Sequence, residues 1–319
     1  MKPLFYLLLL LAVTCSGQQS SQNIPYSDTL HVILNVKADL GEGAIWNQQE
    51  NLLWWIDIEK RIFHKYNPAD GTDKEFPMFR RIGTVVPTIS GKALVALEDG
   101  LNFFDPETGD FTFIADPDAG IPDMRYNDGK CDPSGRFWVG GMGMGKDNQN
   151  KAFLYRLDKD LKIYKMLDKI TCSNGICWSL DKTKMYYIDT PTMKVMVYDY
   201  DDNKGKISNG RLLVEVPREM GAPDGMTIDS DGNLWVCLWG GAGVACFDGT
   251  TGKLLRKIDV PAANVTSCAF GGKDLKTLFI TSASISMSPE SKGKYPLAGN
   301  LFAIDLDVRG VPAFFFLDK

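Results

Sequence analysis

The sequence predicts an all-β protein, a six-bladed β-propeller, because one short strand pattern recurs along its 319 residues. Apolar or aromatic strands centred on six marker residues are separated by 41, 43, 48, 49 and 44 residues, a spacing typical of propeller blades. Further strands follow the markers and end in Asp, Pro or Gly, which is the turn chemistry of antiparallel meanders. No long helical periodicity interrupts them. The markers are Trp54, Val95, Trp138, Tyr186, Trp235 and Phe279.

Each predicted blade contains three recognisable elements. The marker strands are residues 52–57, 93–97, 136–140, 184–189, 233–237 and 277–281, and strands at 62–66, 101–104, 195–200, 244–247 and 301–304 follow them. A further element precedes each marker strand, at residues 41–46, 82–86, 127–131, 173–178, 223–227 and 266–270. A blade cannot cover both of its faces alone, so six such sheets are expected to pack in a ring. Apolar residues at 32–36 and 312–317 suggest that both termini supply strands to the closing blade.

The N-terminus has the pattern of a secretory signal, which we place at residues 1–22. One lysine precedes an apolar run at residues 4–13, too short to cross a membrane core that needs about 20 apolar residues. Cys15 follows a loose lipobox, so a lipoprotein leader ending before Cys15 and cleavage a few residues later both remain open. We therefore expect an exported protein, periplasmic or secreted, with one propeller domain at residues 23–319.

Composition limits the possible partners. Lysine and arginine total 35 against 40 acidic residues, a net charge of −5, and the sequence has no dense basic patch. Binding to nucleic acid relies on such a patch, so no nucleic-acid partner is expected. Membrane contact is expected only through a lipid anchor on Cys15. The oligomeric state does not follow from the sequence.

Six cysteines besides Cys15 fall mostly inside apolar runs and are interpreted as buried small side chains. One alternative stays open, because export permits disulfides. A hairpin turning at residues 240–243 would place Cys237 opposite Cys246.

The elements ahead of the marker strands carry the candidate chemistry. The innermost strands of a propeller line its axis, and Glu42, Asn174 and Asp224 each precede a glycine at the equivalent point of three blades. Alone, each pair would be an ordinary turn. Together they should converge in the central channel, with Asn127 or Asp128 contributing from the third blade.

Converging carboxylates and amides need a positive charge, which a divalent metal ion supplies. The all-oxygen donor set favours a hard ion, Ca²⁺ or Mg²⁺, although such sites can accept Mn²⁺ or Zn²⁺. Histidine is excluded, because His31 lies near the mature N-terminus and His64 in a strand away from the axis. Arg125 is either a solvated or salt-bridged residue at a strand end or a cation at the channel mouth that touches substrate.

These motifs resemble the SMP-30/gluconolactonase/luciferin-regenerating enzyme family, which includes regucalcin. The segments that carry the resemblance lie in the family's order between about residues 38 and 308: residues 41–46, 125–130 with 132–136, 173–175 with 178–179, 223–226 with 231–236, and 266–272. The loop at residues 140–147 departs from the family, because it lacks a glutamate that some members present to substrate.

The resemblance implies that Glu42, Asn174 and Asp224 bind one divalent ion, most simply Ca²⁺, and that members hydrolyse sugar lactones. It further implies that Asn127 lies beside metal and substrate, that Arg125 contacts substrate, and that Asp224 is the general acid/base. Two rival functions remain. One is a non-catalytic exported sugar- or calcium-binding propeller, and the other is a paraoxonase-like arylesterase or phosphotriesterase, which is disfavoured because the predicted axis has no histidine.

Overall fold

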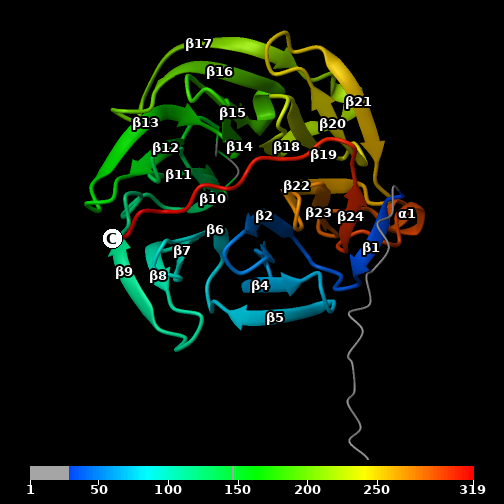
Figure 1. Cartoon of the computed structure of the whole chain (residues 1–319), viewed down its shortest axis with the longest axis horizontal. Helices are drawn as coiled ribbons and strands as arrows, with labels where there is room; N and C mark the ends of the chain where they lie inside the picture. Colours follow the sequence, from blue (N-terminus) through cyan, green and yellow to red (C-terminus); the bar gives the residue numbers. More distant parts are fainter. Residues whose placement is uncertain (1–28, 146, 148) are drawn as a thin grey trace, which may run out of the picture.

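The computed structural model describes residues 29–145, 147 and 149–319, and these residues form six four-stranded antiparallel sheets arranged in a ring (Figure 1). The predicted six-bladed propeller is therefore confirmed. The proposed signal peptide and Cys15 lie outside the described residues. Among those described, no helix is long and apolar enough to cross a bilayer.

The blades follow one another in chain order. Blade one holds β2 (Gly41–Asn47), β3 (Leu52–Asp57), β4 (Ile62–Asn67) and β5 (Thr72–Pro77); blade two β6 (Ile82–Pro87), β7 (Ala93–Leu97), β8 (Gly100–Phe104) and β9 (Phe111–Ala115); blade three β10 (Met124–Cys131), β11 (Phe137–Gly143), β12 (Ala152–Leu157) and β13 (Ile163–Ile170). Blade four holds β14 (Ser173–Trp178), β15 (Lys184–Asp189), β16 (Lys194–Asp201) and β17 (Lys206–Glu215); blade five β18 (Ala222–Ile228), β19 (Leu234–Trp239), β20 (Gly243–Phe247) and β21 (Leu254–Asp259); blade six β22 (Asn264–Gly271), β23 (Thr277–Ala283), β24 (Leu301–Asp305) and β1 (His31–Leu34). The short helical segments are η1 (Thr190–Thr192), η2 (Arg218–Met220) and α1 (Pro289–Lys294).

The core lies between neighbouring blades and is built mainly by the second strand of each. The marker side chains Trp54, Trp138 and Trp235 are fully buried in these strands. The fourth strands of blades one to five were not predicted, because they face solvent and carry a polar pattern. In β21, for example, nearly every residue is exposed.

Residues 31–34 and residues 312–317 pair with different blades, which corrects one expectation. Residues 31–34 form β1, which pairs with β24 and completes blade six, as predicted for the N-terminal segment. The prediction that residues 312–317 join the same blade is wrong. That segment instead crosses the face of the ring (red in Figure 1) and forms a parallel bridge between Phe316 and Thr88 of blade two.

We call residues 309–318 the C-terminal strap. Its backbone donates or accepts hydrogen bonds at four blades: Arg309 accepts from Ser230 of blade five, Gly310 donates to Leu275 of blade six, Phe316 bonds to Pro87 and Ile89 of blade two, and Leu317 donates to Gly135 of blade three. The Gln48 side chain of blade one also donates to Ala313 (2.8 Å). The strap therefore ties five blades together on one face of the ring.

The first strand of each blade lines the axis, and these inner strands contact one another in sequence around the ring. All six have a register irregularity against their second strand at an equivalent step, which in blades one, three, four and five carries candidate residues. The irregularities lie between Glu42 and Ile45, Ile82 and Thr84, Tyr126 and Gly129, Asn174 and Ile176, Pro223 and Met226, and Val265 and Cys268. A bulge redirects the side chains beside it.

In blades four and five, glycine follows the candidate residue because the next inner strand comes very close. A Cβ at Gly175 would lie 2.7 Å from the carbonyl oxygen of Asp224, and one at Gly225 would lie 2.6 Å from that of Thr266. At these two positions the glycine is a packing requirement of the ring, and the residue before it is the candidate ligand.

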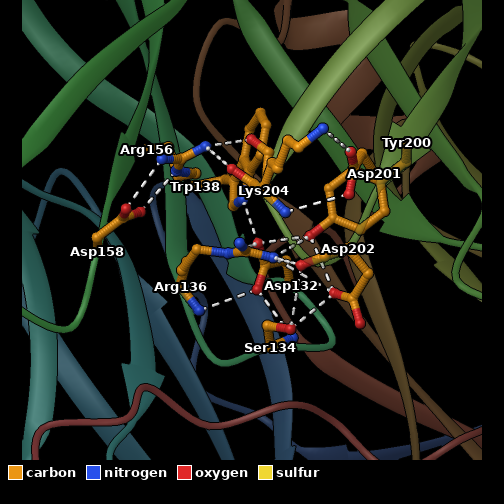
Figure 2. Close-up of polar contacts among 11 residues, drawn as sticks. Asp132, Ser134, Arg136, Trp138, Arg156, Asp158, Tyr200, Asp201, Asp202 and Lys204 are labelled. Atoms are coloured by element: carbon orange, nitrogen blue, oxygen red, sulfur yellow. Dashed lines mark hydrogen bonds and ion pairs between the residues drawn. The ribbon is translucent and has the colours of Figure 1, made fainter.

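A buried aspartate after the inner strand stabilises the junction between blades three and four (Figure 2). Asp132 is fully buried, and its Oδ2 accepts hydrogen bonds from Arg136 Nε (2.6 Å), Trp138 Nε1 (2.9 Å) and Tyr200 Oη (2.7 Å), the last of these in blade four. In blade five, Asp229 accepts from Trp235 Nε1 in the same way (2.9 Å). This repeated contact explains why an aspartate precedes the buried tryptophan by six residues in both blades.

The possible Cys237–Cys246 disulfide is not formed. The turn between β19 and β20 lies one residue earlier in the chain than assumed, so Val244 lies opposite Cys237 and Trp235 lies opposite Cys246. All six cysteines of the described residues are free, and five of them are buried, in agreement with the simpler interpretation.

Candidate functional site

Two acidic side chains from different blades meet in the central channel. Glu42 of β2 and Asp224 of β18 are both buried, and a hydrogen bond joins their carboxyl groups. Burial, followed by the charge of Asp128, raises the pKa of Glu42 to about 8. Burial, followed by the charge of Glu42, raises the pKa of Asp224 well above its usual value. Two carboxyl groups so close in a desolvated site cannot both ionise without a compensating cation.

Asp128 of β10 brings a third acidic group to this site. Its Oδ1 accepts a hydrogen bond from the backbone N–H of Gly129 (2.8 Å), while its buried Oδ2 has no hydrogen-bond partner among the described residues. Burial raises the pKa of Asp128, and the nearby ammonium group of Lys130 opposes that shift. The free oxygen is available to a cation or to a proton donor on a ligand.

Amide groups and an arginine continue the site. Asn127 Nδ2 donates to the backbone oxygen of Ser173 (2.6 Å) and to Asn174 Oδ1 (3.2 Å), which joins β10 to β14. Arg125 Nη1 donates to Asn127 Oδ1 (2.6 Å) and to the carbonyl oxygen of Tyr126 (2.9 Å). Arg125 is thus buried beside the candidate residues, and its Nε has no partner among the described residues.

The six candidate residues therefore occupy the inner strands of four blades in two linked groups. Glu42, Asp224 and Asp128 interact through their charges, while Asn174, Asn127 and Arg125 form a chain of hydrogen bonds. The Arg125 charge lowers the pKa of Glu42, which connects the two groups. The alternative of a solvated arginine at a strand end is not supported, because Arg125 is buried.

These residues fit a divalent cation with oxygen ligands. The carboxyl groups have raised pKa values in the absence of bound charge, Asp128 has an oxygen without a donor, and the donor atoms are carboxylate and amide oxygens, which Ca²⁺ and Mg²⁺ prefer. The arrangement can hold the ion on Glu42, Asn174 and Asp224, and can present Arg125 and Asn127 to a polar ligand beside it.

Sequence reasoning missed three side chains at this site. Thr190 of η1 accepts a hydrogen bond from Asn174 Nδ2 (2.8 Å) and donates to the carbonyl oxygen of Pro223 (2.8 Å), so it fixes the Asn174 amide against blade five. Cys172 Sγ lies 3.9 Å from Asn127 Nδ2 and 3.8 Å from Asn174 Nδ2. Lys130 Nζ donates to the carbonyl oxygen of Met226 and so reaches from blade three to blade five. Only the position of Cys172 just before Ser173 could have signalled its role.

A separate group of ligand-type side chains lies on the β4–β5 hairpin of blade one. The candidate ligand atoms of His64, Asp73 and Glu75 lie within 4.8 Å of one another. His64 stacks on Trp55 with ring centroids 3.7 Å apart, and its Nδ1 is 2.6 Å from Asp73 Oδ2. These contacts build the packing of an outer strand pair, and they place His64 away from the axis as predicted.

The fold and the channel define a class of protein: a six-bladed β-propeller whose axis gathers carboxyl groups, amides and an arginine from four blades. Within that class, the chain belongs to the SMP-30/gluconolactonase/LRE-like family, whose model matches residues 40–284. The matched region contains all six inner strands and every candidate residue. The resemblance seen in the sequence is confirmed, and because the family includes gluconolactonases, lactone hydrolysis is supported at the family level.

Relatives cover nearly the whole propeller. The chain is 36% identical over 276 residues to the "Putative sugar lactone lactonase YvrE" of Bacillus subtilis, covering 86% of this chain and 94% of the relative. It is 36% identical over 284 residues to regucalcin of Danio rerio, covering 88% and 96%.

Two solved structures are similar over most of their length. A luciferin-regenerating enzyme superposes with a TM-score of 0.85 at 31% identity and covers 91% of this chain and 99% of its own. Regucalcin of Agrobacterium tumefaciens, described as a calcium-binding protein, superposes with a TM-score of 0.86 at 27% identity and covers 91% and 98%.

Proposed function

We propose that this protein is a metal-dependent lactonase that opens a sugar-acid lactone in its central channel. The observation that carries the proposal is the meeting of Glu42 and Asp224 in a buried channel beside Asn174, Asn127 and Arg125. The lactonase name of a relative at 36% identity supports the same reaction class.

Glu42, Asn174 and Asp224 would hold one divalent ion, for which Ca²⁺ is the first choice and Mg²⁺, Mn²⁺ and Zn²⁺ are alternatives. A bound divalent ion supplies Lewis-acid chemistry: it polarises the lactone carbonyl and stabilises the negative charge that develops on its oxygen. With the ion present, Asp224 is held as a carboxylate, which suits it to accept a proton at neutral pH.

The proton then follows a short path through Asp224. Asp224 takes a proton from the attacking water as the new carbon–oxygen bond forms, and returns it to the ring oxygen as the ring bond breaks. Arg125 and Asn127 donate hydrogen bonds to the sugar hydroxyl groups and orient the ring. The reaction balances with one water consumed and one hydroxy acid formed.

A panel of aldonolactones tests the proposal. Protein without residues 1–22 is stripped with a chelator, resupplied with each divalent ion in turn, and assayed for acid release by pH indicator, with Asp224→Asn as the matched inactive variant. Turnover above the spontaneous rate that depends on added metal is expected. Metal binding without turnover of any lactone would favour a non-catalytic calcium-binding propeller, a possibility suggested by the description of the Agrobacterium relative.

We also propose that the protein is exported through the leader at residues 1–22. Cell fractionation and the mass of the mature N-terminus test this. A mature chain that begins at a lipid-modified Cys15 indicates a membrane-anchored form, one that begins a few residues later indicates a periplasmic or secreted form, and an uncleaved chain in the cytoplasm would contradict export.

A further inference from the structure

A cavity of about 610 Å³ lies at the opposite end of the channel from the candidate site. The candidate residues occupy the beginnings and middles of the inner strands, whereas the cavity is lined by the strand ends and by the C-terminal strap. Its walls are largely apolar. They include Trp46, Trp178, Ile228 and Phe270 from four blades and Phe314 from the strap.

Lys130 separates this cavity from the candidate site. Its ammonium group donates a hydrogen bond to the carbonyl oxygen of Met226 on the far side of the channel. Its positive charge also lowers the pKa of Asp128 in the candidate site, against the rise that burial causes. Lys130 also lines the cavity, and among the lining residues it is the one that carries a charge. The cavity therefore has its own charge character, an apolar wall with a single cation.

Two lining side chains have buried polar atoms without a hydrogen-bond partner among the described residues. One is Trp178 Nε1, on a side chain that is 4% exposed, and the other is Gln48 Oε1. Trp178 packs between Trp138 and Tyr200, so its ring is held in place. A buried indole N–H without an acceptor is unfavourable, and a ligand that brings an acceptor would relieve this.

The cavity is accessible from solvent. Two of its lining residues, Ile89 and Leu180, are exposed and form part of its rim. Gln48 is tied to the strap by its other amide atom, Nε2, so the strap forms a fixed wall on this side.

We propose that this cavity binds a small apolar acid, a molecule with an aliphatic or aromatic body and one carboxylate or sulfonate head. The body packs against Trp46, Ile228 and Phe270, and the head accepts the Trp178 N–H within the field of Lys130. This site is distinct from the proposed lactonase site and does not depend on it.

Fluorescence titration with 8-anilinonaphthalene-1-sulfonate tests the proposal, because this dye is an apolar acid and Trp46 and Trp178 lie in the wall. One dye per chain is expected, with quenching of tryptophan emission, and decanoate should displace it. Decanol has the same body without the charge and should displace it at least tenfold more weakly. Equal displacement by decanol would overturn the assignment of an acidic head.

Two variants locate the binding. Ala313→Trp fills the cavity from the strap and should abolish dye binding, while Ala119→Trp, at an exposed loop, should not. Trp178→Phe keeps an aromatic ring without the donor and should weaken decanoate about tenfold, the cost of one hydrogen bond to a charged group. Its control is Trp55→Phe, which removes an indole that is bonded to Asp73 outside the cavity.

Melting curves verify that each variant is folded. If Ala313→Trp does not fold, the result for Trp178→Phe decides whether the acid binds in this cavity. Dye that binds at several sites, or that binds Trp178→Phe and wild type equally, would overturn the proposal. Lactone turnover should be the same in all four variants and is measured separately, so failure of the lactonase assay leaves this test intact.

Discussion

Replacing Glu42 by glutamine should change stability in opposite directions with and without metal. The pKa of this buried side chain is raised from 4.5 to about 8 in the folded protein. An acid whose folded pKa is raised binds its proton more tightly in the folded state, so the metal-free protein loses stability as pH rises from about 4.5 to 8. Glutamine cannot ionise, so Glu42→Gln removes this loss.

The size of this loss of stability follows from the shift in the pKa of Glu42. At pH 8 the raised pKa corresponds to on the order of 4 kcal/mol of destabilisation, and at pH 5 to little. In a domain of this length each kcal/mol moves Tm by roughly 2 °C, so metal-free Glu42→Gln should melt about 8 °C above metal-free wild type at pH 8.

Saturating calcium should make wild type more stable than Glu42→Gln. The ion binds the ionised carboxylate in the native state only, and at a ten-thousandfold excess over Kd it adds about 5.5 kcal/mol to wild type, more than the roughly 4 kcal/mol that the ionised carboxylate costs at pH 8. Glutamine is a weaker ligand, so Glu42→Gln should gain much less.

Differential scanning calorimetry from pH 5 to 8, with chelator or with Ca²⁺, measures both effects. Glu107→Gln, at an exposed turn after β8, is the matched control and should follow wild type throughout. If metal-free wild type and Glu42→Gln lost stability in parallel with pH, the buried-acid reasoning would be refuted. An equal gain from Ca²⁺ would show that Glu42 is not a ligand.

Three further substitutions test the catalytic and structural assignments. Asp224→Asn keeps an oxygen for the metal but cannot accept a proton, so kcat at saturating metal should fall at least about 100-fold; recovery of near wild-type kcat on raising the metal concentration would make Asp224 a ligand only, with Asp128 the next candidate base. Arg125→Met should raise KM for lactones about tenfold or more with a smaller change in kcat. The control Arg80→Met, at a partly exposed arginine outside the channel, should leave both constants unchanged. A normal KM in Arg125→Met would remove Arg125 from the substrate site. Asp132→Asn removes the closer and more buried of the two carboxylates that pair with Arg136, and should lower the free energy of unfolding by roughly 3 kcal/mol in urea titration, against no measurable change for the exposed Asp181→Asn. Equal stability would mean that the buried network in Figure 2 is not required.

The sequence was informative wherever a residue's role depends on its position in the repeat. The inner strands and their channel residues recur once per blade, so Glu42, Asn174 and Asp224 could be placed on equivalent strands. The outer strands of blades one to five could not be found, because exposed strands such as β21 carry no apolar pattern.

Features that depend on ring geometry were beyond the sequence. The apolar residues 312–317 look like a strand, and only the closed ring shows that they cross its face. The reach of Lys130 to Met226 depends on the width of the channel. The Cys237–Cys246 pairing failed because a turn that lies one residue earlier changes every partner along a hairpin.

The pairing of β1 with β24 has a consequence for how the chain is made. The strand β1 leaves the ribosome early but finds its partner only when residues 301–303 have been synthesised. Until then β23 has an unpaired edge, a surface on which strands of other chains can add. Closing so large a loop is entropically costly and slow, so an interrupted translation product should be prone to aggregation even if its first five blades are complete. The ring can therefore close only after the last blade has been synthesised.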